Sequence, residues 1–292
     1  MKIEGIIPAL CTPTDEKGDI NVEALHMLLD YVINAGVHGV FVLGSSGEFY
    51  ALDKKNRELL MRETISYVNK RCPVMIGASG NSTREVIEEV KMASNSGADC
   101  VSVLTPYFIV PNQYELEKYY CEISNSTTLP LSIYNNPGRT KVNVSPAVLR
   151  NIIKNTNIVG IKDSSGDFSQ MLDFIEISKE HSNFSVLSGR DNLLFANLVH
   201  GGHGGVVAVG NVIPKIMVEI YNEVKSKNYE NALELQFSIL EYRNSFCLGN
   251  FPAVVKQSLS MIGIDAGLPL SPVQPLSDKA LNEVKEILSK LI

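Results

Sequence analysis

The sequence lacks the features of several common protein classes. No apolar run reaches the roughly 18 residues that a membrane-spanning helix needs, so we expect no membrane partner. The first residues lead into Ile7-Pro8 without the apolar stretch of a secretion signal. The chain carries 26 basic and 32 acidic residues, a net charge of −6. This balance disfavours the basic surface that nucleic-acid binding requires.

Cysteines and histidines are few and form no pattern. The five cysteines are odd in number, have no metal-binding spacing and mostly lie in or beside apolar stretches. They predict buried free thiols in a cytoplasmic protein. The five histidines share no set of expected strand ends, and neither a carboxylate nor a cysteine is suitably spaced beside His200 and His203. We therefore expect no metal site and disfavour a metal-dependent aldolase.

The 292 residues, 45% of them hydrophobic, suffice for a full core. Eight short runs rich in Val, Ile and Leu lack clean alternation, which is typical of parallel strands buried on both faces. They are residues 6–10, 39–43, 74–77, 100–104, 129–134, 158–162, 185–188 and 205–209.

Helix signals lie between these runs. Asn21, Asp53, Ser82 and Ser145 stand where helices would begin, and glycines follow several of the helical patterns. Strand and helix thus alternate every 20 to 35 residues or so, the rhythm of an α/β fold of the (β/α)8 TIM barrel type. An open doubly wound sheet is the alternative, disfavoured because no Gly-x-Gly-x-x-Gly follows the first strand.

We predict a barrel over residues 1–212 and a C-terminal helical extension over residues 213–292. The extension should contain helices at about 214–227, 229–242, 251–262 and 278–291. Its Pro-rich stretch, residues 269–275, should be a loop between the last two helices.

Lys162 stands at the end of the apolar run 158–162, before a polar turn that ends in Gly166. An ammonium loses hydration in a buried strand, a cost tolerated mostly where a lysine must lose its proton and attack a carbonyl. We therefore interpret Lys162 as a Schiff-base lysine. The alternative is a structural lysine paired with a carboxylate such as Asp163.

Polar residues follow two other expected strands. The turn Gly44-Ser45-Ser46-Gly47-Glu48 offers backbone N–H groups and hydroxyls to an anion, or is simply a tight turn with a capping serine. Tyr134 ends the fifth run, where it would lie beside Lys162 and serve as a proton shuttle, or pack at the rim. The guanidinium of Arg139 is suited to bind a carboxylate through two parallel hydrogen bonds, or it takes part in a surface ion pair.

Two later loops give weaker signals. Residues 188–191, which include Gly189, and residues 204–206, which include Val206, fit either a close approach of backbone to a small ligand or ordinary turns.

Together these motifs resemble the dihydrodipicolinate synthase and N-acetylneuraminate lyase family of pyruvate-dependent class I lyases, over essentially the whole chain. The resemblance implies Lys162 as the imine-forming residue, Tyr134 as the proton donor and Ser45 in the proton relay. It further implies that Ser46 holds the pyruvate carboxylate and that Val206 contacts pyruvate through its backbone. No cofactor beyond the covalent imine is implied, and family members are usually homotetramers; a homotetramer or homodimer is therefore expected.

Arg139 resembles the synthase branch, in which an arginine meets the carboxylate of aspartate semialdehyde. Phe108, however, stands where the synthase carries a relay tyrosine, and it has no hydroxyl. Condensation of pyruvate with aspartate 4-semialdehyde is the leading prediction. Alternatives are an aldolase for 2-keto-3-deoxy sugar acids, another lyase or dehydratase for 2-oxo acids such as a 4-hydroxy-2-oxo acid, or, third, N-acetylneuraminate cleavage. A different class is a non-catalytic protein that binds a 2-oxo acid.

Overall fold

The computed structural model describes residues 2–154 and 157–292. Its strands lie within two residues of the predicted starts and ends: β1 (Gly5–Pro8), β2 (Val40–Val42), β3 (Val74–Ala78), β4 (Cys100–Leu104), β5 (Leu131–Asn135), β6 (Ile158–Asp163), β7 (Ser185–Ser188) and β8 (Gly204–Val207). Their order in the sheet is β1-β8-β7-β6-β5-β4-β3-β2. With a helix after each strand, this is the topology of a (β/α)8 barrel, and the predicted fold class is confirmed.

Helices follow the strands in chain order. They are α1 (Val22–Asn34), α2 (Lys54–Val68), α3 (Thr83–Ser96), α4 (Gln113–Asn125), α5 (Pro137–Thr140), α6 (Pro146–Ile152), α7 (Phe168–Lys179), α8 (Leu194–Val199), α9 (Pro214–Lys225), α10 (Tyr229–Ser238), α11 (Leu240–Asn244), α12 (Ala253–Met261) and α13 (Asp278–Leu288). Three short 3₁₀ helices are η1 (Asp191–Leu193), η2 (Val209–Asn211) and η3 (Ser245–Leu248). In the described residues, no helix combines the length and the apolar character needed to cross a membrane.

Two compact units make up the chain. The first unit is Met1–Gly5 with Met75–Val206, and the second is Ile6–Val74 with Val207–Ile292. The proposed boundary between barrel and extension at residue 212 is a different division, based on element order, and stays a prediction.

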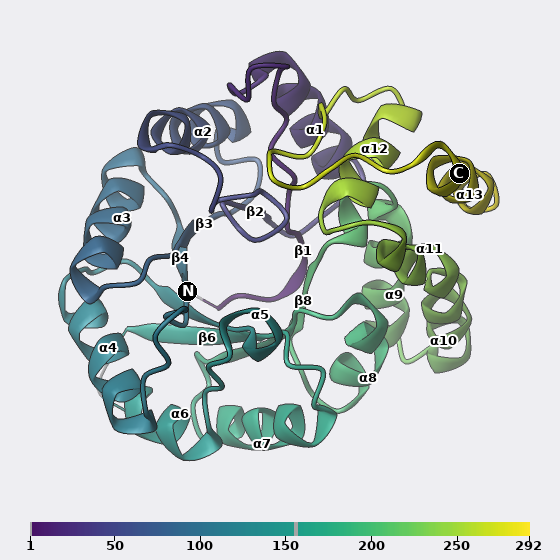
Figure 1. Cartoon of the computed structure of the whole chain (residues 1–292). Helices are drawn as coiled ribbons and strands as arrows, with labels where there is room; N and C mark the ends of the chain where they lie inside the picture. The colour runs from purple at the N-terminus through teal and green to yellow at the C-terminus, as the bar shows by residue number, and fades with distance from the viewer. Residues whose placement is uncertain (1, 155–156) are drawn as a thin grey trace. The chain divides into compact units, whose positions relative to one another are not determined.

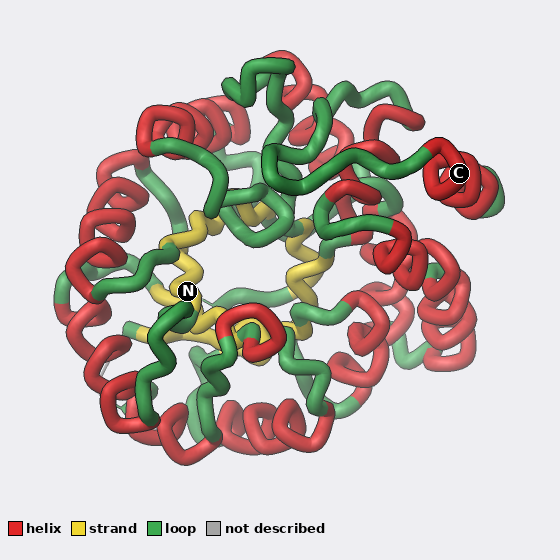
Figure 2. Tube along the Cα trace, viewed as in Figure 1, coloured by secondary structure: helices red, strands yellow, loops and turns green. Residues whose placement is uncertain are grey.

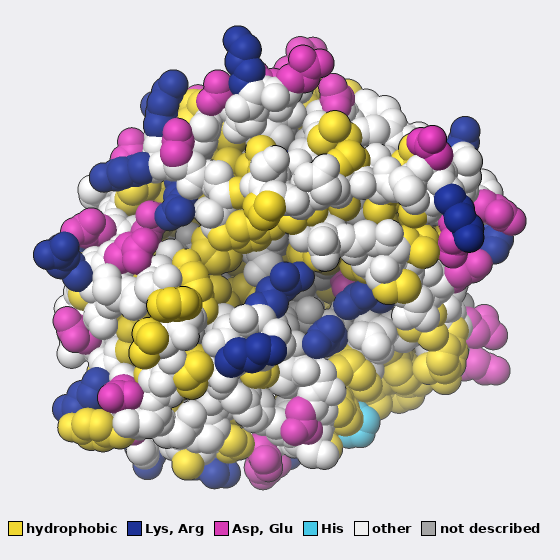
Figure 3. Space-filling model, in the orientation of Figure 1, with side chains coloured by type: hydrophobic (Ala, Val, Ile, Leu, Met, Phe, Trp, Pro, Cys, Tyr) yellow, Lys and Arg dark blue, Asp and Glu magenta, His cyan; other side chains and the backbone are white. Residues whose placement is uncertain are grey.

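The first unit contains parallel strands with helices along their outer side. β4, β5, β6 and β7 pair side by side, and α3, α4, α6 and α7 succeed one another outside them (Figure 1). The outward faces of α3 and α4 carry acidic and basic side chains interspersed (Figure 3). These helices are therefore amphipathic in the way that a helix covering a sheet must be.

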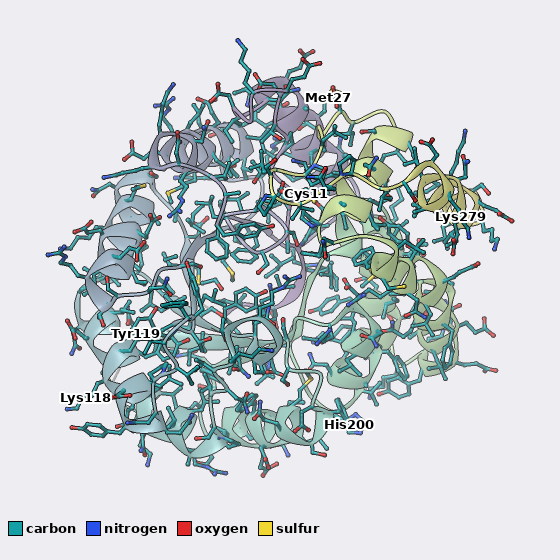
Figure 4. The ribbon with its side chains drawn as sticks, in the orientation of Figure 1. Cys11, Met27, Lys118, Tyr119, His200 and Lys279 are labelled. Atoms are coloured by element: carbon teal, nitrogen blue, oxygen red, sulfur yellow. The ribbon has the colours of Figure 1, made fainter. Side chains whose placement is uncertain are left out.

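Helix α4 shows how sequence sets this packing. Its capping box joins Asn112 and Glu115, each side chain accepting the other's backbone N–H. Lys118 points outward while its neighbour Tyr119 points inward (Figure 4). The Tyr119 hydroxyl donates to the carbonyl of Leu104 over 3.0 Å, so the ring is buried without leaving its polar end unsatisfied.

The second unit contains the C-terminal helices. The predicted helix over 229–242 is two helices, α10 and α11, and the loop around Pro269–Pro275 lies between α12 and α13 as predicted (Figure 2). Across both units, all five cysteines are free. Cys11, Cys72 and Cys100 are buried, whereas Cys121 is half-buried and Cys247 exposed, so the prediction of buried thiols holds for three of them.

Candidate functional site

Tyr134 and Lys162 are direct partners in the pairing of β5 with β6. Because partners in a parallel pair point to the same face, their side chains meet: Lys162 Nζ lies 3.8 Å from the centroid of the Tyr134 ring. The sequence predicted this adjacency from the strand order, and the pairing confirms it. Both side chains are almost fully buried, with 4% of Lys162 and 5% of Tyr134 exposed.

The burial of Lys162 governs its acid–base behaviour. Desolvation lowers the pKa of Lys162 below its ordinary value of 10.5, because the ammonium is disfavoured away from water. Tyr134 and the buried Asp191 of η1 counteract this, and the nearby positive charge of Arg139 lowers the pKa further. The net effect enlarges the fraction of neutral amine, the form that attacks a carbonyl.

Asp163 belongs to a separate cluster from its neighbour Lys162. Adjacent residues in a strand face opposite sides, and the Asp163 carboxylate accepts from Asn135 Nδ2 at 2.7 Å and from Ser165 Oγ at 2.6 Å. Burial raises the pKa of Asp163, and these hydrogen bonds oppose the rise. The carboxylate therefore fixes the ends of β5 and β6, and the alternative of a Lys162–Asp163 pair is not the arrangement observed.

Asn135 continues this cluster on the β5 side. Its Nδ2 also donates to Asn143 Oδ1 at 2.8 Å, and its Oδ1 accepts the backbone N–H of Val144 at 3.0 Å. The residue thereby ties the end of β5 to the segment that follows α5.

The short helix α5 brings two polar side chains near Tyr134. Asn136, which precedes the helix, donates from Nδ2 to the Tyr134 hydroxyl over 3.0 Å. Arg139 is exposed, yet close enough to Lys162 to affect its pKa. The guanidinium, a group that can bind a carboxylate through two parallel hydrogen bonds, thus lies near the buried amine.

Gly189 lies against the stem of Lys162. A Cβ at this position would come within 3.1 Å of Lys162 Cε and within 2.0 Å of Ser164 Oγ. Its own N–H donates to the carbonyl of Asp163 over 2.7 Å, which fixes the turn after β7. A side chain here would therefore displace Ser164 and press against Lys162. Val206 is buried in β8, and its predicted backbone contact with a substrate stays a prediction.

The Ser45-Ser46 turn belongs to the second unit. It follows β2, and both serines are buried. Leu43 and Glu48, on either side, have positive φ values of 59° and 52°. Such a conformation costs a residue with a side chain about 1–3 kcal/mol and persists only where the surroundings impose it. The turn is therefore held in place, as a preformed binding loop would be.

Three polar residues of these regions were not predicted as part of the site. Asp191 lies in the 188–191 loop that the sequence analysis noted, but nothing in the sequence indicates its effect on Lys162. Asn136 stands inside the Tyr134–Thr140 motif, and its bond to Tyr134 depends on the turn into α5. Lys256 binds Glu48 from a position 208 residues away, which no local pattern reveals. Among the described residues, no group of three or more His, Cys, Asp or Glu is arranged to hold a metal ion.

Known proteins resemble this chain over its full length. The model of the dihydrodipicolinate synthetase family matches residues 2–291. A 4-hydroxy-tetrahydrodipicolinate synthase of Methanospirillum hungatei is 32% identical over 289 residues, covering 98% of this chain and 99% of the relative.

Solved structures agree with the family model. The dihydrodipicolinate synthase of Thermotoga maritima has a TM-score of 0.95 at 34% identity, covering 99% of both chains. A prophage protein of the dihydrodipicolinic acid synthase family from E. coli K12, solved in complex with pyruvate, has a TM-score of 0.95 at 31% identity, covering 99% of this chain and 98% of its own. The predicted resemblance is confirmed: this chain belongs to the dihydrodipicolinate synthetase family.

Proposed function

We propose that the protein is a Schiff-base lyase that condenses pyruvate with aspartate 4-semialdehyde, the reaction of a 4-hydroxy-tetrahydrodipicolinate synthase. The observation that carries the proposal is the buried amine of Lys162, with its lowered pKa, directly beside Tyr134. The names of the curated relatives indicate the same reaction for those proteins. Lysine biosynthesis is the corresponding pathway.

In the proposed reaction, neutral Lys162 attacks the keto carbon of pyruvate. The carbinolamine takes a proton through Tyr134 and loses water, which leaves an imine on Lys162. The protonated imine withdraws electrons, so the methyl group of pyruvate loses a proton and becomes the nucleophile that attacks the aldehyde. The new alkoxide takes up a proton, and the amino group that came with aspartate semialdehyde then attacks the imine carbon, which closes the ring and releases the amine of Lys162. No cofactor is required, since the covalent imine itself acts as the electron sink.

The remaining residues are proposed to bind the two carboxylates. Ser46 and the N–H groups of its turn would hold the pyruvate carboxylate, and Ser45 would supply a hydroxyl to the proton relay. The backbones at Gly189 and Val206 would line the pyruvate position, and Arg139 would bind the carboxylate of the aldehyde.

We further propose a cytoplasmic homo-oligomer, a homotetramer or homodimer. The loop before α4 exposes Phe108, Ile109 and Val110, and Tyr114 at the start of α4 is exposed as well, with 87% of Phe108 accessible. Large apolar side chains gathered in this way favour a surface that a second copy covers. Light scattering on the purified protein would measure the mass of the assembly.

The second candidate is an aldolase for a 2-keto-3-deoxy sugar acid, favoured by Phe108. This side chain lacks the hydroxyl that the synthase reaction would use in its proton relay.

An aldehyde panel separates the two candidates. Pyruvate consumption is measured with aspartate 4-semialdehyde, glyceraldehyde and N-acetylmannosamine at equal concentrations. We expect kcat/KM to be highest for aspartate 4-semialdehyde, by at least about tenfold, the selectivity expected of a site with a hydrogen-bonded carboxylate partner. Highest activity with glyceraldehyde would replace the synthase by the aldolase. Turnover of none of them would favour a protein that only binds 2-oxo acids.

A further inference from the structure

Glu48, at the end of the Ser45-Ser46 turn, is a carboxylate with no exposed surface. Its φ of 52° is one that side-chain-bearing residues rarely adopt. Burial of the carboxylate and strain of the backbone are both unfavourable, so strong interactions must hold the residue. Glu48 does not cap the following helix. The helix cap of α2 is in fact Asp53, whose side chain accepts the N–H of Asn56.

The partners of Glu48 come from the C-terminal part of the second unit. One carboxylate oxygen accepts from Lys256 Nζ of α12 at 2.9 Å, and Lys256 likewise has no exposed surface. The other oxygen accepts the backbone N–H of Leu270 at 2.7 Å. Both oxygens are thus bound by residues more than 200 positions further along the chain.

Lys256 is in turn held from the N-terminal side. Its Nζ also donates to Thr14 Oγ1 over 3.0 Å. Cys11, labelled in Figure 4, lies close enough for both charges of the pair to affect its pKa, which burial raises to about 12. The thiol therefore stays protonated and adds no charge beside the pair, so Lys256 and Glu48 have each other as their charged partner.

A second bond fixes the turn one residue earlier. The Thr12 hydroxyl donates to the carbonyl of Gly47 over 2.7 Å, and a Cβ on Gly47 would come within 3.1 Å of the carbonyl of Leu10. The turn is therefore pressed against the segment after β1 on one side and bound to α12 on the other. Within the turn, the N–H groups of Gly47 and Glu48 donate to the carbonyls of Gly44 and Ser45.

A buried ion pair is a poor way to gain stability alone. Well-packed apolar residues of similar volume usually stabilise a core as well or better. Apolar packing, however, has no direction, whereas the three side-chain bonds of Glu48 and Lys256 fix where the turn ends. The pair is therefore better explained by the position it imposes on the turn.

We propose that Glu48 and Lys256 are positioning residues that hold the Ser45-Ser46 turn in the geometry that binds the substrate carboxylate. The C-terminal extension thereby takes part in pyruvate binding through α12, without touching the substrate. The inference rests on the proposed function, since it takes these serines as the carboxylate site.

The test uses the full-length protein and three variants. Lys256→Met removes the cation, Glu48→Gln removes the anion but keeps an acceptor for Leu270, and the double variant removes both charges. Each single variant leaves one buried charge without its counterion and is destabilised, so the double variant, which buries no charge here, is the decisive one if the singles do not fold.

Two controls separate positioning from stability. Lys290→Met removes a lysine from the exposed pair with Glu241 in the same extension. Val284→Ala creates a cavity at a fully buried position of α13 and lowers stability without altering any bond described above.

Two readouts are compared, the KM for pyruvate against kcat, and amide hydrogen exchange of residues 43–51. We expect the double variant to raise the KM for pyruvate about 10- to 100-fold, the loss typical of a binding group displaced by about 1 Å, with a much smaller change in kcat. Exchange at Gly47 and Glu48 should accelerate in the same variant. The controls should change neither, although Val284→Ala melts at a lower temperature.

The outcomes are distinguishable. A wild-type KM and unchanged exchange in the double variant would overturn the positioning role while leaving the proposed function intact. If the wild-type protein forms no imine with pyruvate, the proposed function fails. In that case, faster exchange in the double variant would still show that the ion pair anchors the turn. Unchanged exchange would show that it does not. Equal KM increases in the double variant and in Val284→Ala would reduce the pair to a structural element.

Discussion

Tyr134 and Lys162 are register partners on neighbouring parallel strands, with the lysine Nζ 3.8 Å from the centroid of the tyrosine ring. The next residues, Asn135 and Asp163, are also partners but face the other side of the sheet. The last two residues of each strand thus belong to two separate clusters, one on each face of the sheet. One face carries the amine of Lys162 beside the phenol of Tyr134, and the other carries the hydrogen bonds of Asn135 and Asp163 that hold the strand ends.

The first prediction concerns Tyr134→Phe. The fold should persist because the ring remains, while turnover should fall by roughly 10²–10⁴, the usual contribution of a general acid or base. Steady-state kinetics with a melting curve would measure both. The matched control is Tyr229→Phe on the exposed surface of α10; an unchanged rate in Tyr134→Phe would remove the phenol from the mechanism.

Asn136→Ala removes the donor to the Tyr134 hydroxyl. We predict a decrease in kcat of about three- to tenfold, since one hydrogen bond contributes about 0.5–1.5 kcal/mol. Because Asn136 would act through Tyr134, the same substitution should have no further effect in a Tyr134→Phe background. Additive losses in the double variant would contradict this coupling. Asn151→Ala, at an exposed position of α6, is the control.

Lys162→Met should abolish turnover and stabilise the fold at neutral pH. The pKa of Lys162 is lowered by burial in the folded protein relative to the unfolded chain. The unfolded chain therefore binds more protons between the two pKa values, and the stability of the wild-type protein rises with pH through that window.

Below the folded pKa the buried ammonium imposes its full penalty, about 1.4 kcal/mol for each unit by which the pKa is lowered. The methionine variant avoids this penalty. Its advantage should shrink as the pH approaches 10.5, the ordinary pKa of lysine. Denaturant unfolding at pH 7 and pH 10 would measure it, with Lys91→Met on the exposed face of α3 as the control. A less stable variant at pH 7 would contradict the sign.

Arg139→Gln tests the binding of the second substrate. The variant lacks the guanidinium that would bind the carboxylate of the aldehyde. The KM for the aldehyde should therefore rise by at least about tenfold, the effect of losing one charge-assisted hydrogen-bonded pair. Imine formation with pyruvate should persist. The pH dependence of imine formation should shift to higher pH, because the charge of Arg139 helps to lower the pKa of Lys162. Arg150→Gln at the end of α6 should leave both unchanged; a pyruvate-specific loss in Arg139→Gln would instead place the arginine at the other carboxylate.

Much of the fold could be predicted because it depends on local pattern. A strand buried on both faces appears in the sequence as a short apolar run. The residues expected to begin helices also cap them in the structure, namely Asn21, Asp53, Ser82 and Ser145. Ser82 and Glu85 have the spacing of a capping box, but the Glu85 side chain accepts the N–H of Asn81 rather than that of Ser82. Such choices depend on side-chain geometry that spacing does not specify.

The site was predictable only where strand order decides proximity. Tyr134 and Lys162 end consecutive strands, so their contact follows from the topology. The bond of Asn136 to Tyr134 depends on a turn geometry, and that of Glu48 to Lys256 joins segments far apart in sequence. The single predicted helix over 229–242 is interrupted at Ile239, which is fully buried. Tertiary packing, which no periodicity records, decides each of these cases.

The central claim is that the amine of Lys162 forms an imine with pyruvate. Borohydride is added to the protein with and without pyruvate, and the intact mass and the peptide that carries Lys162 are determined by mass spectrometry. We predict the mass gain of one reduced pyruvate at Lys162, absent without pyruvate and absent in Lys162→Met. No gain in the wild-type protein, or an equal gain on another lysine in Lys162→Met, would contradict the account.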